Sequence, residues 1–324
     1  MNRRHAAIAA LALVCAGAAA LAQANYPDRP IRILVGFSAG VAPDVTSRLF
    51  ADKFNDSWAK GVVVENVTGA GGNLAVERVA KSAPDGYTLT MGGNAALVIN
   101  PNLIDKLGYD PLKDFAYISQ VFIVPNLLVV LPEFPANDIK ELIALAKQKP
   151  DLLVAGHAGV GTSQHLAGEL FMAMAGVKMQ QVPYRGTTQI LPDLLGGRLN
   201  IFFGNISNLL PLVREGKLRA FAVTSRQRSP QIAELPTMEE LGFANFEATA
   251  WFGLIAPAGT PRPIVDLIHR ETTNVLAMPD VRGKLEGLGL QLVGNTPAQF
   301  AGLIENETRA WGKVIKDANI QAAQ

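Results

Sequence analysis

Two loops of small and hydroxyl-bearing residues are the parts of this sequence best suited to bind an anion. Residues 37–44 (FSAGVAPD) and 156–165 (GHAGVGTSQH) each follow a strand-like run and lead into a helical pattern. Small residues let a ligand approach the backbone, and the N–H groups at a helix start attract negative charge. In the second loop, Thr162 or Ser163 can cap the helix. For the first loop, the alternative is a plain strand-to-helix turn with Asp44 as the cap.

Catalysis at these loops is the competing interpretation. Ser163 lies two residues before His165, but its surroundings are not Gly-x-Ser-x-Gly, and residues two apart on a helix point in different directions. Asp44 likewise has no base that the sequence places within its reach. Beyond the N-terminal segment the chain has three histidines and no cysteine, which argues against a transition-metal site. We therefore expect a protein that is not an enzyme and that needs no metal or cofactor.

Two further motifs follow later strand-like runs. Residues 66–73 (NVTGAGGN) look like a dinucleotide-binding loop, but Leu74 stands where a third glycine or alanine is needed. A backbone turn beside a cleft is the better interpretation of this segment. Residues 183–188 (PYRGTT) offer a phenol and a guanidinium at one strand tip. Arg185 has the geometry to clamp a carboxylate, although an isolated arginine is more often a solvated charge, and Tyr184 is the better candidate for a cleft wall.

These loops need a scaffold of alternating strands and helices to position them. Short β-branched runs alternate with segments of helical spacing, an order typical of parallel sheets covered by helices on both faces. The tail from residue 261 to residue 324 is mostly helical, with Thr296 as the cap of the last long helix. The expected strands are 31–35, 62–64, 87–91, 152–155, 179–183, 199–203 and 218–223, and the expected helices are 45–54, 74–83, 139–147, 164–174 and 190–195.

Two strand-like segments, 126–131 and 247–256, lie where this rhythm changes, and proline follows each of them. We interpret them as a pair of strands that cross between two lobes. Without its N-terminal segment, which is discussed next, the chain has roughly 300 residues, more than one hydrophobic core usually holds. The expected fold is therefore two doubly wound α/β lobes joined by a two-strand hinge, on which they close over a ligand. Lobe one would comprise residues 25–125 plus 252–324, and lobe two residues 126–251.

The N-terminus predicts export. Two arginines precede an uncharged run over residues 6–22, and Ala22-Gln23-Ala24 fits a cleavage site, so residues 1–24 are expected to be a cleaved signal peptide. The run is shorter than the ~20 residues of a membrane-spanning helix. Cys15, the only cysteine, lies inside the run and not in a lipid-attachment box. Loss of this segment leaves 27 basic and 28 acidic side chains, and a net charge of −1 does not favour nucleic acid binding.

Over its whole mature length the chain resembles the tripartite tricarboxylate transporter substrate-binding proteins, also called the Bug family. The resemblance implies a type II periplasmic binding protein fold, one ligand in the cleft between the lobes, and delivery to a separate membrane permease. No segment alone is decisive, but the following occur in the family's order: YPDRPIRILVGFSAG, the AGG turn, PDGYTL, YDPLKDF, GVGTSQHLAGELF, PYRGTTQILPDLLGGRLNIFFGN, GKLRAFAVTSRQRSP, LPTMEELG and WFGLIAPAGTP.

The resemblance also implies which residues meet the ligand, a small organic acid. In the family its carboxylate is held by loops from both lobes, largely through main-chain N–H groups and bridging waters. A monomer in the periplasm with a permease as partner is the corresponding expectation, and a sensor that presents the ligand to a signalling kinase is the alternative. The matching positions are Phe37, Ser38, Ala39, Gly40, Gly93 and Asn94 from lobe one, and Gly161, Thr162, Ser163, Tyr184, Gly204 and Asn205 from lobe two.

Two departures from the family pattern bear on the ligand. Ser38 and Val41 stand where the family has proline and a second glycine, which adds a hydroxyl and narrows one approach to the backbone. Members that bind amino acids have an aspartate at the position of Gly204. A buried ammonium without that partner is costly, so we expect an acid without an α-ammonium group. We expect the helices beginning near Asp44 and Thr162 to point their N-termini at this anion.

Overall fold

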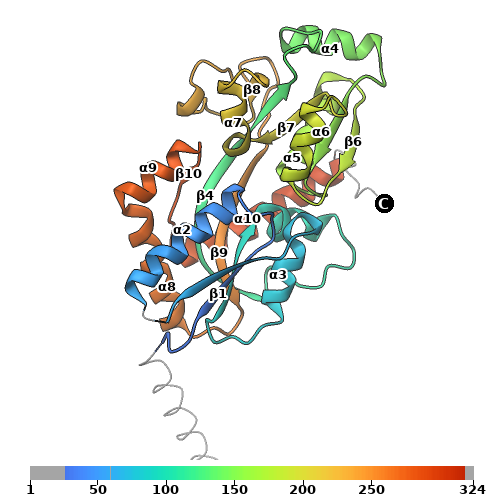
Figure 1. The fold of residues 1–324 in the computed structure, drawn as a ribbon. Coiled ribbons are helices and arrows are strands. Elements are labelled where there is room, and N and C mark those ends of the chain that lie inside the picture. The colour runs from blue at the N-terminus through green and yellow to red at the C-terminus, as the bar shows by residue number, and fades with distance from the viewer. Residues whose placement is uncertain (1–25, 59, 318–324) are drawn as a thin grey trace, which may run out of the picture.

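The computed structural model describes residues 26–58 and 60–317, which form two α/β lobes around two sheets that share one long strand (Figure 1). This strand, β4 (Phe115–Val130), pairs through residues 115–125 with β9 (Thr249–Pro257) and through residues 126–130 with the strands of the second sheet. We call the halves built on the first and second sheets lobe one and lobe two. The expected signal peptide, with its cleavage after Ala24, lies outside the described residues.

Lobe one is built on a mixed sheet with the strand order β2-β1-β3-β9-β4. The central β1 (Ile31–Val35) runs parallel to β2 (Val62–Asn66) and β3 (Thr88–Gly93), whereas β9 runs antiparallel to β3 and β4. The short β10 (Gln291–Leu292) pairs with β4. Helices cover both faces of this sheet, which explains the almost continuous apolar sequence of β1.

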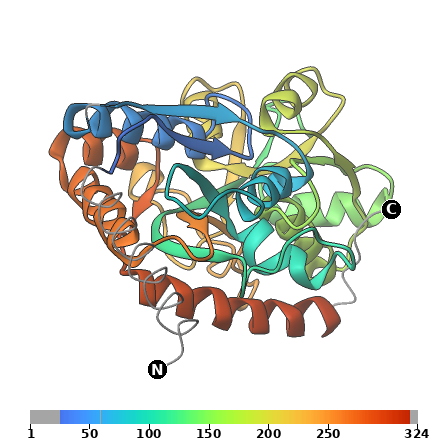
Figure 2. The same cartoon turned by 90° about the horizontal axis from the view of Figure 1, so that it is seen from below.

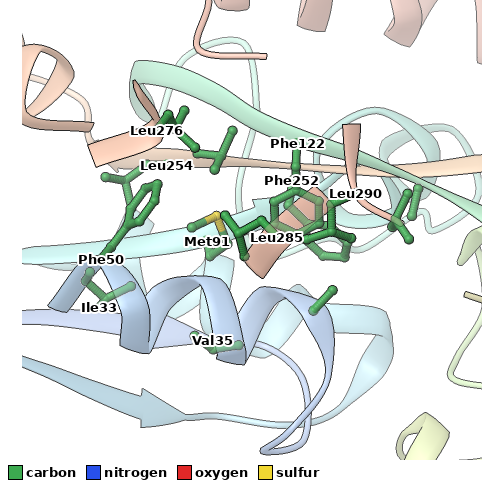
Figure 3. Close-up of a cluster of buried hydrophobic side chains, with 14 of the residues drawn as sticks. Ile33, Val35, Phe50, Met91, Phe122, Phe252, Leu254, Leu276, Leu285 and Leu290 are labelled. Atoms are coloured by element: carbon green, nitrogen blue, oxygen red, sulfur yellow. The ribbon is translucent and has the colours of Figure 1, made fainter. Parts of the chain in front are cut away.

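Alternate side chains of β1 face two different helix layers. Ile33 and Val35 belong to one apolar cluster, in which Figure 3 shows Phe50 near Ile33 and Leu285 near Met91, whereas Leu34 belongs to a second cluster. The C-terminal helix, which is drawn in red and runs along the lower edge of Figure 2, contributes residues to this second cluster. The first layer consists of α2 (Ala42–Ser57), α8 (Arg262–Ala277) and α9 (Pro279–Gly287), and the second of α3 (Asn73–Ala80) and α10 (Pro297–Asp317).

Lobe two is built on the strands β6-β5-β7 and the second part of β4. β5 (Val154–His157) runs parallel to β6 (Gln180–Pro183) and to β7 (Ile201–Asn205), and both β7 and β8 (Arg219–Val223) run antiparallel to β4. Its helices are α4 (Ile139–Gln148), α5 (Ser163–Ala175), α6 (Thr187–Leu195) and α7 (Ile206–Arg214). Short helical turns complete the chain at η1 (Ala70–Gly72), η2 (Ala95–Ile99), η3 (Asn100–Asn102) and η4 (Pro230–Ile232).

The seven strands expected from the alternating pattern are all present, with ends that shift by at most two residues, and the expected helices shift by at most three. The segment expected as a strand over residues 126–131 is the second part of the longer β4. The strand over residues 115–125 was not expected, because the polar pair Ser119 and Gln120 interrupts its apolar sequence. The lobe boundaries at 125/126 and 251/252 remain a proposal, and β9 itself begins at Thr249. Among the described residues, no helix is both long and apolar enough to cross a membrane.

Candidate ligand-binding site

A cavity lies between the two lobes. None of its lining residues carries a charge, and the two lobes supply walls of different chemistry. The residues from lobe one are Phe37, Ser38, Val41, Pro43, Gly93, Asn94, Ala95, Ala250 and Phe252, and those from lobe two are Ala158, Thr162, Ser163, Gln164, Thr187 and Asn205.

Three helices of lobe two begin at the cavity wall. Helix α5 begins at Ser163 and is capped by Thr162, whose hydroxyl accepts a hydrogen bond from the His165 N–H. Helix α6 begins at Thr187 after Gly186, and α7 begins after Asn205, and neither helix has a side chain that caps its first N–H groups. The first N–H groups of a helix have no partner within it and carry partial positive charge. Lobe two therefore presents three electropositive helix ends to one cavity.

A network of hydrogen bonds fixes the polar side chains of this wall. The Gln164 side chain accepts from the Ala158 N–H at 2.9 Å and donates to the Thr187 hydroxyl at 3.0 Å. The side-chain oxygen of Asn126, which is fully buried on β4, accepts from the Asn205 amide at 2.8 Å.

The same oxygen also faces the Ser163 hydroxyl at 3.4 Å, and the Asn126 amide donates to the Ala248 carbonyl at 2.8 Å. Asn126 thus ties two cavity residues to β4 and to the residue that precedes β9.

The wall from lobe one is mostly apolar. The rings of Phe37 and Phe252 meet edge to face with their centroids 5.4 Å apart, and Val41 and Ala250 continue the same surface. Ser38 and Asn94 are the exceptions, and the Asn94 amide donates one of its two hydrogens to the Thr249 carbonyl at 3.0 Å. This wall suits the apolar part of a ligand better than its charged part.

Helix α2 does not offer the positive end that the sequence predicted for it. Val41 and not Asp44 is the N-cap, and the buried carboxylate of Asp44 reaches back to accept from the Gly40 N–H at 2.8 Å. Burial alone would raise the pKa of Asp44, but hydrogen bonds from Arg48, Gly40 and Asn66 hold it below its ordinary value. A carboxylate in the first turn cancels much of the attraction that a helix N-terminus exerts on an anion.

The two lobes also touch each other directly. A Cβ atom on Gly159 would lie 2.7 Å from the backbone nitrogen of Gly71, and one on Gly186 would lie 2.5 Å from the Ser38 hydroxyl oxygen. Gly71 belongs to the segment that looks like a dinucleotide-binding loop. Its role in the structure is this close contact between the lobes, in line with the interpretation as a turn beside the cleft.

Seven of the twelve residues inferred from the family resemblance line the cavity, namely Phe37, Ser38, Gly93, Asn94, Thr162, Ser163 and Asn205. The structure places the other five beside it: Ala39 and Gly40 are exposed, Gly161 packs against Asn100, Tyr184 donates to Asp193 at 2.6 Å, and the Cα–H of Gly204 faces Phe202 and Leu209.

Gly204 and Asn205 point to opposite sides because successive residues of a strand alternate. The exposed Arg185 likewise does not line the cavity.

The sequence argument missed eight lining residues. Gln164 and Thr187 lie inside the motifs already singled out, and their position at a helix start was the signal that could have found them. Ala250 and Phe252 alternate on β9, which predicts one shared face, but only the tertiary structure shows what that face meets. The remaining four are Val41, Pro43, Ala95 and Ala158.

The two buried histidines of the second loop support its backbone. His157 and His165 accept hydrogen bonds through Nδ1 from the N–H groups of Gly159 and Gly161, at 3.2 and 3.3 Å. Burial lowers the pKa of both, and the neighbouring His157 helps to bring that of His165 to about 4. Ser163 pairs with Asn126 and not with a histidine, so no activated nucleophile is formed. Within the described residues no group of His, Cys, Asp or Glu could hold a metal.

Two α/β lobes joined by crossing strands, with a cavity between them, define a periplasmic binding protein of type II. The chain belongs to the tripartite tricarboxylate transporter receptor family, whose model, "Tripartite tricarboxylate transporter family receptor", matches residues 46–320. This family, which includes the Bug proteins, consists of periplasmic receptors and not enzymes. The family and fold expected from the sequence are thereby confirmed.

Three solved structures illustrate the similarity. The periplasmic binding protein BugD is 34% identical, with a TM-score of 0.87 over 91% of this chain and 99% of that chain. Rpa4515 from R. palustris, solved with adipate, has the same identity, TM-score and coverage. MatC (Rpa3494) from Rhodopseudomonas palustris, solved with malate, is 33% identical, with a TM-score of 0.84 over 90% of this chain and 100% of that chain.

Proposed function

We propose that this protein captures a small organic carboxylate between its lobes in the periplasm and delivers it to a tripartite membrane permease. The observation that carries the proposal is the convergence of the starts of α5, α6 and α7 on one uncharged cavity. Oriented N–H groups bind a carboxylate without a counter-ion, which suits a receptor that must also release its ligand. The relatives solved with adipate and malate support this class of ligand.

Transport is favoured over signalling because the matching family is defined by its transporter. The mature protein would begin near Asn25, after removal of the signal peptide, and act as a monomer. N-terminal sequencing of the exported protein tests the cleavage. Deletion of the permease genes tests the partner: ligand uptake should then be lost, whereas retained uptake with a lost transcriptional response would favour the sensor.

The ligand is expected to lack an α-ammonium group. The reason is the whole lining and not Gly204, because none of the lining residues is a carboxylate that could pair with an ammonium. An unpaired charge in a closed cavity loses more than a neutral hydrogen bond returns.

Isothermal titration calorimetry with a panel of carboxylic acids tests the function, with succinate and aspartate as the matched pair that tests the ammonium. A bound acid also raises the melting temperature, because saturation at a hundred times Kd stabilises the fold by ~2.7 kcal/mol. Absence of binding by every acid would refute the function. Tighter binding of aspartate than of succinate and every other amino-free acid would refute only the exclusion of amino acids.

A further inference from the structure

We propose that Asn100, a residue of lobe one outside the cavity, opposes closure of the lobes and thereby weakens ligand binding and speeds ligand release. The inference rests on the proposed function, because it concerns the closure that captures the ligand. It goes further because it assigns part of the balance between capture and release to a side chain that does not line the cavity. We call the arrangement in the structure, with the lobes in contact, the closed form.

Asn100 lies at a contact between the two lobes. It is the first residue of η3 and is fully buried. Gly161 belongs to the loop of lobe two that precedes α5, and a Cβ atom on it would overlap the Asn100 side-chain oxygen. The Cα–H of Gly161 therefore covers this oxygen directly. Because neither residue lies on a strand that crosses between the lobes, opening of the lobes would separate them and admit water to Asn100.

The Asn100 amide has a hydrogen-bond partner at one end only. Its nitrogen donates to the Asn73 side-chain oxygen at 2.9 Å. Its own oxygen is buried and accepts no hydrogen bond from any group in residues 26–58 and 60–317. The N–H of Gly161 is already used, because it donates to His165 Nδ1 at 3.3 Å, and a Cα–H is a weak donor. A buried side-chain oxygen without a partner is uncommon in folded proteins and requires an explanation.

The missing hydrogen bond makes the closed form less favourable than the open form. In the open form water can donate to the Asn100 oxygen, and closure removes this water without supplying another donor. We expect the loss to weaken binding by about tenfold, which corresponds to ~1.4 kcal/mol. Because the cost applies to the closed form alone, most of it should appear as faster dissociation.

The other contacts of Asn100 do not depend on closure. Asn73, which accepts from Asn100, also accepts from the Tyr109 hydroxyl at 3.0 Å, and all three residues belong to lobe one. This network is therefore the same in the open and closed forms. Loss of the bond to Asn73 should lower the melting temperature of the protein without changing the balance between the two forms.

Two substitutions of similar shape change the cost of burial in opposite directions. Asn100→Leu removes the unpaired oxygen, so the mature protein should bind malate or adipate several-fold more tightly and release it more slowly. Asn100→Asp buries a charge at the same place and should weaken binding at least tenfold. Calorimetry and stopped-flow dissociation measure these effects. Weaker binding in both variants would mean that Asn100 supports the closed form, and would overturn the inference.

Asn102→Leu is the matched control on the same turn. The Asn102 amide donates to the carbonyls of Val98 and Thr308, both in lobe one. The control should therefore lower the melting temperature and leave the affinity unchanged. A gain in affinity equal to that of Asn100→Leu would assign the effect to the turn as a whole and contradict a specific role of Asn100.

A disulfide trap measures closure without a ligand. A Cβ on Gly186 would lie 3.7 Å from the Ser38 Cβ, a separation that suits a disulfide between the lobes. Cys15, the only cysteine, lies in the expected signal peptide, so the pair Ser38→Cys and Gly186→Cys has no competing thiol in the mature protein. The rate of disulfide formation under a fixed oxidant then reports how often the lobes close.

We expect trapping to be several-fold faster with Asn100→Leu, slower with Asn100→Asp, and unchanged with Asn102→Leu. Melting curves control for folding, and if Asn100→Leu does not fold, Asn100→Asp must still slow the trapping. Equal rates in every background would overturn the inference and leave the proposed function intact. Absence of binding by any carboxylate would instead refute the proposed function, while the trapping rates would still decide the role of Asn100.

Discussion

Gly71 of lobe one and Gly159 of lobe two approach so closely that a Cβ on Gly159 would lie 2.9 Å from the Cα of Gly71. Both have positive φ, at 64° and 125°. Two reasons require glycine here: the backbone has a positive φ, and the neighbouring atoms are backbone atoms that cannot rotate away as a side chain could. The contact joins loops from different lobes, so its cost or gain applies only when the lobes are together.

Gly159→Ala should therefore weaken ligand binding by roughly tenfold, because a misplaced methyl costs about 1–3 kcal/mol. Calorimetry with the best acid of the panel measures this. The control is Gly176→Ala, a residue of lobe two with φ 62° and open space around its Cα. It also has a positive φ, although one that alanine adopts at a lower cost than the 125° of Gly159, and it does not touch lobe one. Equal affinity losses in the two variants would mean that the contact plays no part in closure.

Closure itself should be visible in solution. Within residues 26–58 and 60–317 the chain passes between the lobes in β4 and in the segment that enters β9, so the lobes are expected to move as rigid bodies about these strands. Small-angle X-ray scattering should give a smaller radius of gyration with saturating ligand than without it. An unchanged radius under saturation shown by calorimetry would speak against a hinge at these strands.

Stability should fall on acidification below about pH 6.5 because of the two buried histidines. Burial lowers the pKa of both in the folded state, to about 4 for His165, so the folded protein binds fewer protons than the unfolded chain once the pH falls below about 6.5. Unfolding is then favoured as the pH falls through that window, by up to ~1.4 kcal/mol per pH unit for each histidine. The Glu169 carboxylate lies 3.7 Å from His165 Nε2, but burial and the neighbouring His157 determine the direction of the His165 pKa shift.

Denaturant unfolding at several pH values measures this dependence, with His165→Asn as the control. Asparagine can still accept the Gly161 N–H but does not titrate, so the variant should show a shallower slope over the same window. A slope as steep as in the unchanged protein would assign the acid sensitivity to other groups.

Asn205→Asp should abolish most carboxylate binding. The change preserves shape but places a negative charge in the cavity wall at the start of α7, and like charges in contact cost several kcal/mol. We expect at least a tenfold rise in Kd. Asn208→Asp adds the same charge on the same helix outside the lining and should have little effect. Comparable losses in both variants would indicate a general effect of charge.

Gly204→Asp should damage folding and not change the ligand. A Cβ at this position would collide with the side chains of Phe202 and Leu209, on the side of β7 away from the cavity. We expect a lower melting temperature, a loss of about 1–3 kcal/mol, and no gain of aspartate binding. Calorimetric detection of aspartate binding in this variant would show that position 204 does reach the ligand.

The sequence by itself determined the fold class, the order of strands and helices, and the two loops that face each other across the cleft. Periodic burial and small residues at strand ends are local signals, and they place Ser38, Thr162 and Ser163 near one another once the topology is known.

The resemblance to the receptor family added Gly93, Asn94 and Asn205. The resemblance did not predict which side of each strand faces the cavity. Successive residues alternate between the two sides, so an error of one residue exchanges Gly204 for Asn205.

Only the tertiary structure decided which chemistry each wall has. Nothing local to Phe252 or Ala250 shows that they face Thr187 and Gln164 from the other lobe, because these contacts join residues far apart in the chain. Likewise, the sequence alone predicts an anion site at the helix start near Asp44. The structure shows instead that the Asp44 carboxylate accepts a hydrogen bond from Gly40 and pairs with Arg48. The polarity of a binding site depends on residues that are far apart in the chain, and these residues come together only when the chain folds.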